Sequence, residues 1–175
     1  MLARESTVSN ELREASFSTF KAETKEEHEA KEFAIKQAKE YLNGITGNTL
    51  IMGNPGTGKS HLCYSMAKAI NEGYKSRNEP KSVLFVSITE IITRIQSDWQ
   101  YRQSDFTEYD ALKLLTEVDY LFIDDLGTES VMNSQKMKLI IGYRPFFSRF
   151  LISETQLSST PITTEKSWPE SIMIS

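Results

Sequence analysis

The chain alternates short, continuous apolar runs with longer segments in which apolar residues recur every three or four positions. The runs are rich in β-branched and aromatic residues, which predicts buried strands at 48–53, 82–88 and 120–125. Segments with helical spacing lie at 59–70, 89–99, 107–117 and 133–144. Strands that alternate with helices predict an α/β protein with a parallel sheet covered by helices on both faces.

Both ends of the chain depart from this pattern. Residues 1–16 are polar and charged, which predicts a flexible lead-in. Thr24 opens a T-x-x-E capping box, which predicts a charged surface helix of about five turns up to Gly44. Pro145 stops the last predicted helix, and after it only a candidate strand at 150–153 stands out. The expected division is a lead-in at 1–16, one domain at 17–145 and an atypical tail at 146–175.

The stretch GNPGTGKSHL at 53–62 fits the pattern G-x-x-x-x-G-K-[S/T] and lies between a predicted strand and a predicted helix. Glycines let successive backbone amides face one concavity, and the start of a helix adds positive charge, so the loop suits phosphate. Lys59 would reach the β and γ phosphates, and the Ser60 hydroxyl would bind Mg²⁺. We expect ATP and Mg as cofactors, with the nucleotide held by Gly53, Asn54, Pro55, Gly56, Thr57, Gly58, Lys59, Ser60 and His61.

Two carboxylates end the third predicted strand, at the sheet edge where such ligands bind. Asp124 is expected to bind Mg²⁺ together with Ser60. Asp125 either polarises the attacking water or caps a nearby loop or helix, and as an aspartate it is one methylene shorter than glutamate, so we expect weak hydrolysis. Arg144 either reaches the γ-phosphate of a neighbouring subunit or is a solvated charge at a helix end.

Composition narrows the remaining choices. The net charge of −4 argues against a strongly basic nucleic-acid binder, so any DNA contact is expected to be a local patch. No apolar run is long enough for a membrane span and no secretory signal is found, so we expect a cytoplasmic protein. A single cysteine, Cys63, and two histidines are few ligands for a zinc site.

For the side chains of His61 and Cys63 we expect packing rather than catalysis. Phe17 and Phe20 either flank the nucleotide base or anchor the lead-in.

The motifs GNPGTGKSHL and YLFIDDLGTE resemble those of the AAA+ ATPases that load replicative helicases, the DnaC and DnaI type, and of the related IstB transposition helpers. The segment ASFSTFKAET at 15–24 is similar to the opening of bacterial and phage loaders, and IIGYR at 140–144 to a later helix of that family. The resemblance implies phosphate binding by 53–60, Mg²⁺ binding by Ser60 and Asp124, and water activation by Asp125. It also implies self-assembly and contacts with single-stranded DNA and a replicative helicase.

Two features depart from that family. Its separate N-terminal helicase-binding region is not in the chain, and no sequence matches the strand whose Asn senses the γ-phosphate. Reading the codons from Gln156 in a shifted frame permits a similar strand, so our hypothesis is a frameshift in the tail, which the nucleotide sequence tests. The C-terminal strands are expected to be incomplete. Either 150–153 fills the central position in the sheet or the sheet is weakened by unpaired backbone groups.

The sequence leaves three classes of function open. The first is an AAA+ helicase loader of a phage or bacterium, and the second is an IstB-like helper ATPase with the same site and a different DNA partner. The third is an interaction protein, or a defective product, that binds nucleotide without turnover. A P-loop kinase is disfavoured because no arginine-rich lid segment is found.

Overall fold

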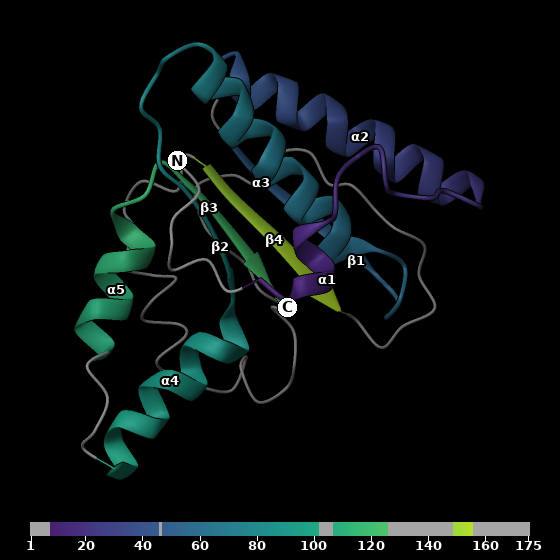
Figure 1. The fold of residues 1–175 in the computed structure, drawn as a ribbon. Coiled ribbons are helices and arrows are strands. Elements are labelled where there is room, and N and C mark those ends of the chain that lie inside the picture. Colours follow the sequence, from purple (N-terminus) through teal and green to yellow (C-terminus); the bar gives the residue numbers. More distant parts are fainter. Residues whose placement is uncertain (1–7, 46, 102–106, 126–148, 156–175) are drawn as a thin grey trace.

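The structure is a computed structural model that describes residues 8–45, 47–101, 107–125 and 149–155. After the first two helices, β1, α3, β2 and α4 alternate, and α5 then precedes the last two described strands (Figure 1). In chain order the elements are α1 (Asn10–Arg13), α2 (Lys25–Leu42), β1 (Gly47–Gly53), α3 (Lys59–Ser76), β2 (Val83–Ser87), α4 (Ile88–Tyr101), α5 (Glu108–Thr116), β3 (Tyr120–Asp124) and β4 (Arg149–Thr155).

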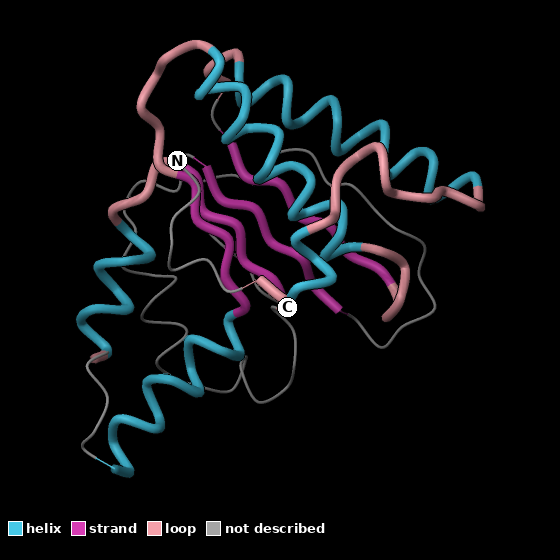
Figure 2. The backbone as a smooth tube through the Cα atoms, viewed as in Figure 1, coloured by secondary structure: helices cyan, strands magenta, loops and turns pink. Residues whose placement is uncertain are grey.

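The four strands form one sheet in the order β1-β4-β3-β2 (Figure 2). Every pairing is parallel, with Thr49 opposite Leu151, Phe122 opposite Leu151 and Phe85 opposite Phe122. The order of the strands in the sheet differs from their order along the chain, as in other α/β folds. The predicted α/β class with a parallel sheet is confirmed.

Strand β4 occupies the central position that the sequence left open. It pairs along its full length with β1 on one side, and its residues 150–152 pair with residues 121–123 of β3 on the other. The predicted strand at 150–153 is therefore present and longer than expected, and the expected gap between the P-loop strand and β3 is filled. Because β4 bonds to both neighbours, it supplies backbone partners along the inner edge of β1 and for residues 121–123 of β3. The frameshift hypothesis concerns the tail after about Pro145, of which the structure describes residues 149–155, and it stays a prediction. The segment from Gln156, where the shifted frame permits a similar strand, lies outside the described residues.

Helix α3 crosses the sheet, and α2 packs along its outer side (Figure 1). Helices α4 and α5 lie at the β2 side of the sheet, away from α2. The core lies mainly between α3 and the strands, and its fully buried members include Leu62, Met66, Ile70, Val83, Phe85, Tyr120 and Phe122. Burial of such side chains is the main term that holds a sheet and its helices together. In the part of the chain that the structure describes, no helix is long and apolar enough to cross a membrane.

Helix starts follow local side-chain chemistry. At α2 the Thr24 hydroxyl accepts a hydrogen bond from the Glu27 amide, and the Glu27 carboxylate accepts one from the Thr24 amide, which confirms the predicted capping box. Thr107 and Asp110 form a second capping box at α5. Helix α4 follows β2 directly and begins at Ile88, one residue before the predicted start at 89. The predicted helix at 133–144 lies outside the described residues.

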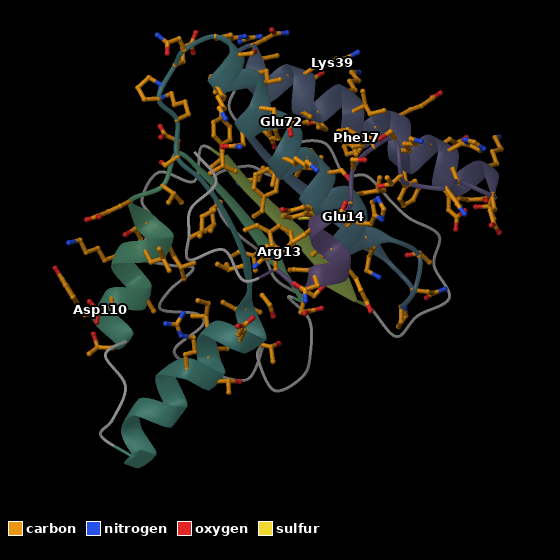
Figure 3. All side chains as sticks on the ribbon, viewed as in Figure 1. Arg13, Glu14, Phe17, Lys39, Glu72 and Asp110 are labelled. Carbon is orange, nitrogen blue, oxygen red and sulfur yellow. The ribbon has the colours of Figure 1, made fainter. Side chains whose placement is uncertain are left out.

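The sequence assigned no element to residues 1–16, whereas the structure contains a short helix there. Ser9 caps α1 by accepting a hydrogen bond from the Leu12 amide. Ala15, after the helix, is 2% exposed, and Leu12 packs against the hydrophobic core. Phe17, in the segment that follows α1, is partly buried and packs against the hydrophobic core (Figure 3). Residues 8–16 are thus packed against the domain.

Candidate functional site

The loop between β1 and α3 has the backbone geometry of an anion-binding turn. Gly56 and Gly58 adopt positive φ angles of 81° and 78°, a region that L side chains seldom occupy. Gly58 is the N-cap of α3 and offers no side-chain cap, so the first amides of α3 receive no capping side chain. Free amides at the start of an 18-residue helix favour a negatively charged ligand. The loop closes on itself through the Thr57 hydroxyl, which donates to the Asn54 carbonyl at 2.9 Å.

Lys59 begins α3 with its side chain folded over the loop. It is only 6% exposed, and its Nζ donates to the carbonyl oxygen of Asn54 at 2.7 Å. Burial lowers the pKa of Lys59, and the negative charges of Asp124 and Asp125 partly oppose that shift. A buried ammonium group held by one carbonyl is incompletely solvated, so an anionic ligand within its reach would supply the missing charge.

Ser60 and Asp124 meet directly. The Ser60 hydroxyl donates to Asp124 Oδ1 at 2.9 Å, although the two residues are 64 positions apart in the chain. Asp124 is the last residue of β3 and is 7% exposed. A hydroxyl and a carboxylate are oxygen ligands of the kind that Mg²⁺ prefers. Among the described residues no group of three or more His, Cys, Asp or Glu forms a metal cluster, so a Mg²⁺ ion held here would take its other ligands from phosphate and water.

Asp125 differs from its neighbour in backbone and exposure. Its φ angle is 60°, and its carboxylate is exposed at the edge of the sheet. The Ser87 hydroxyl, at the end of β2, donates to Asp125 Oδ2 at 3.3 Å. Sequence reasoning missed Ser87. Part of the signal was available, because the carboxyl ends of parallel strands meet at one edge and Ser87 lies near the end of the strand predicted at 82–88, but the order of the strands was not predicted.

His61 faces the N-terminal segment rather than the core. Its Nε2 lies 3.0 Å from the Ser16 carbonyl oxygen and 3.2 Å from the Thr19 hydroxyl. The Phe20 ring lies edge-on to the imidazole with 5.3 Å between centroids, and it also covers Gly58. Phe20 therefore anchors the segment before α2 to the loop.

Two further residues named in the sequence analysis, Cys63 and Arg144, are not among the described residues that form this site. Cys63 is completely buried in α3, and burial, helped by the charge of Asp124, raises the pKa of its thiol well above the usual value. Packing is the role expected for it, and its burial agrees. Arg144 lies outside the described residues.

The chain is similar in sequence to curated replicative helicase loaders. It is 35% identical over 119 residues to the replicative helicase loader DnaC of Buchnera aphidicola subsp. Baizongia pistaciae, and the match covers 66% of this chain and 45% of that protein. The chain thus spans about half the length of this curated relative. No family model matches the chain.

Solved structures of DnaI and DnaA have a similar fold. A crystal structure of DnaI superimposes with a TM-score of 0.60 at 23% identity, over 86% of this chain and 77% of that one. The structure of AMPPCP-bound DnaA from Aquifex aeolicus gives a TM-score of 0.59 at 18% identity, over 81% and 42% of the two chains. The protein therefore has the α/β fold of AAA+ P-loop domains, and its sequence is similar to that of the DnaC helicase loaders.

Proposed function

We propose that this protein binds Mg·ATP at the loop 53–60 and acts as a weakly hydrolysing AAA+ ATPase in the loading of a replicative helicase. The observation that carries the proposal is the hydrogen bond between Ser60 and Asp124 at the start of α3. It places two oxygen ligands beside a glycine loop and a buried lysine. A DnaA with the same fold, in complex with AMPPCP, supports nucleotide binding by such a domain.

Each part of the site has a chemical role in this proposal. The backbone amides of 56–60 would surround the phosphates, and Lys59 would exchange its bond to Asn54 for bonds to the β and γ phosphates. Ser60 and Asp124 would hold Mg²⁺, which neutralises phosphate charge when bound. Asp125, oriented by Ser87, would polarise the attacking water. Arg144 would act from a neighbouring subunit.

The partners follow from the sequence similarity. Relatives named as replicative helicase loaders support a replicative helicase as the partner. We propose the cytoplasm as the place where this protein acts. Single-stranded DNA and further copies of this chain are the other proposed partners. With a net charge of −4, a DNA contact would have to come from a local basic patch, and binding would weaken steeply with added salt.

Calorimetry with Mg·ATP tests the proposed site. The wild-type protein is expected to bind, and Lys59→Ala to weaken binding by about tenfold to a hundredfold, because a charged contact with phosphate is lost. Lys75→Ala is the matched control, since Lys75 is exposed in the last turn of the same helix, about 24 Å away. Equal binding by wild type and Lys59→Ala, or no binding by folded wild type, would contradict the proposal.

Phosphate release separates the ATPase from an interaction protein without turnover. The rate is measured alone, with single-stranded DNA and with a replicative helicase. Turnover that is lost in Lys59→Ala supports an ATPase. Nucleotide binding without turnover in every mixture would support the interaction protein instead. The observation that favours the interaction protein as a second candidate is that Asp125 has a short and exposed side chain.

A further inference from the structure

A short segment of the N-terminal region lies across the first turn of α3. We call residues 15–20 the strap. Its chain is folded into a turn in which the Phe20 amide donates to the Ser16 carbonyl oxygen at 3.1 Å. Ala15 is 2% exposed, and His61 of α3 contacts Ser16 and Thr19 through Nε2. The strap is therefore fixed to the helix that begins at the phosphate-binding loop.

Phe20 ends the strap, and it is held by two contacts to its ring and one to its backbone carbonyl oxygen. A Cβ atom added to Gly58 would lie 2.5 Å from Phe20 Cε2, so the ring packs directly on the backbone of the loop. On another side the ring meets His61 edge-on. From α2, the Lys31 ammonium donates to the Phe20 carbonyl oxygen at 3.0 Å. As a result Phe20 is only 7% exposed.

Gly58 is the loop residue for which such support matters. Its φ of 78° is a left-handed conformation, and glycine visits many other conformations when nothing restrains it. A loop that is ordered before its ligand arrives loses less conformational entropy on binding. A rigid ring on Gly58 excludes alternative loop conformations that would move the backbone into the space that the ring fills.

We propose that Phe20 is a positioning residue that holds the phosphate-binding loop in its binding conformation through Gly58, without itself touching the nucleotide. This inference rests on the proposed binding of Mg·ATP. It assigns the strap a part in ligand binding beyond its packing. It also distinguishes two roles that an aromatic residue near a nucleotide site can have, which are support of the loop and stacking on the base.

The test compares Phe20→Ala with wild type for two ligands, Mg·ATP and magnesium tripolyphosphate, which has no base. Affinities are measured by calorimetry, directly or by competition. Support of the loop predicts that Phe20→Ala weakens both ligands by the same factor, about tenfold. Phe20→Leu keeps a bulky side chain in the same place, so it is expected to restore part of the affinity for both ligands.

Leu12→Ala is the matched control. Leu12 lies on α1 and packs against the same hydrophobic core, with no contact to Gly58 among the nearest neighbours of that residue. It is expected to lower the thermal midpoint and leave both affinities unchanged. A loss of affinity in Leu12→Ala equal to that in Phe20→Ala would mean that general destabilisation explains both, and would overturn the inference.

The remaining outcomes also decide the question. Weakened binding of Mg·ATP with unchanged binding of tripolyphosphate would show stacking on the base and overturn the inference. So would unchanged binding of both ligands by folded Phe20→Ala. If Phe20→Ala does not fold, Phe20→Leu is used alone, and a common loss for both ligands supports the inference whereas no loss overturns it. Failure of wild type to bind either ligand is a separate result, which contradicts the proposed function.

Discussion

The two aspartates at the end of β3 show how one peptide unit separates two environments. Asp124 is buried and accepts a hydrogen bond from Ser60, whereas Asp125 is exposed and meets Ser87. The change occurs because Asp125 leaves the strand with a φ of 60°, which turns its side chain to another part of the sheet edge. Aspartate and asparagine tolerate this conformation better than most residues.

Replacement of Asp125 by Asn tests its role at the scale of one residue. Asn keeps the size of the side chain and tolerates the positive φ, but it cannot take a proton from water. We expect turnover to fall by about tenfold to a hundredfold, with the dissociation constant for Mg·ATP within about twofold of wild type. Both are measured on the same preparation, by phosphate release and by calorimetry.

Asp124→Asn provides the comparison, because Asp124 is proposed to hold Mg²⁺. This variant is expected to weaken Mg·ATP binding itself. Unchanged turnover in Asp125→Asn would remove the proposed role of Asp125. In that case its function would be limited to its hydrogen bond with Ser87.

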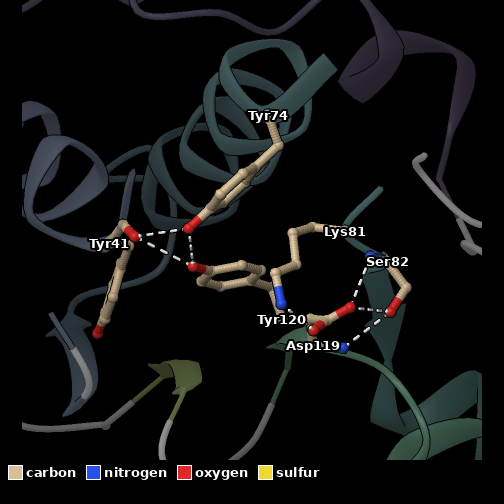
Figure 4. Close-up of polar contacts among 6 residues, drawn as sticks. All are labelled: Tyr41, Tyr74, Lys81, Ser82, Asp119 and Tyr120. Atoms are coloured by element: carbon tan, nitrogen blue, oxygen red, sulfur yellow. Dashed lines mark hydrogen bonds and ion pairs between the residues drawn. The ribbon is translucent and has the colours of Figure 1, made fainter. Parts of the chain in front are cut away.

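Asp119 connects two strands at the opposite edge of the sheet, before β3 begins. Its carboxylate accepts hydrogen bonds from the Ser82 amide at 2.9 Å, the Ser82 hydroxyl at 2.8 Å and Lys81 Nζ at 2.9 Å (Figure 4). Partial burial would raise the pKa of Asp119, but these hydrogen bonds outweigh it and lower the pKa below its usual value. The ionised form is therefore favoured by folding.

The pH dependence of stability follows from this direction. A carboxylate with a lowered pKa stabilises the fold above its unfolded pKa, about 3.9, and the contribution is lost as pH falls through the lower folded value. Asp119→Asn is expected to reduce the free energy of unfolding by about 1 kcal/mol at neutral pH, since the group is partly solvated. Urea unfolding should show that the difference from wild type narrows below about pH 4. A difference that stays constant down to pH 2 would contradict the assignment.

At the scale of elements, local sequence patterns predicted strands and helix caps better than they predicted contacts between elements. The three apolar runs and the capping box at Thr24 could be read directly, because burial and capping leave local signals in the sequence. The start of α4 was misplaced because β2 runs into the helix without a capping residue. The pairing of Ser87 with Asp125 has no local signal, since it depends on which strands are neighbours.

The glycine loop at 53–60 was predicted together with the strand before it and the helix after it. The two proposed magnesium ligands, Ser60 and Asp124, are in contact in the structure. The support that Phe20 gives to Gly58 was beyond sequence reasoning, which left Phe20 either at the nucleotide base or in an anchoring role. Deciding between them required the position of the ring relative to the loop. Contacts between segments about forty residues apart can be inferred from a pattern only when their spatial order is known.

At the scale of the whole molecule, a buried group of hydrogen bonds and a central strand hold the sheet and helices in place. At the far edge, the hydroxyls of Tyr74 and Tyr120 lie 2.6 Å apart and both contact the carbonyl oxygen of Tyr41 (Figure 4). This buried group joins α2, α3 and β3. Between β1 and β3 the connection is β4, the strand that comes last among the described elements. Since β1 leads to Ser60 and β3 ends at Asp124, the geometry of the proposed magnesium site depends on β4.

Ile152→Pro tests this dependence. In the register of the sheet, residue 152 lies opposite Leu50 of β1 and Ile123 of β3. Proline removes a backbone donor and fits poorly in a central strand, so we expect the free energy of unfolding to fall by about 3 kcal/mol or more. Affinity for Mg·ATP should fall in parallel because Ser60 and Asp124 are no longer held together. Ile152→Val, which keeps the amide and the β-branched shape, should remain near wild type in both measurements. If urea unfolding and calorimetry gave the same values for Ile152→Pro and Ile152→Val, β4 could not be the strand that joins the two halves of the site.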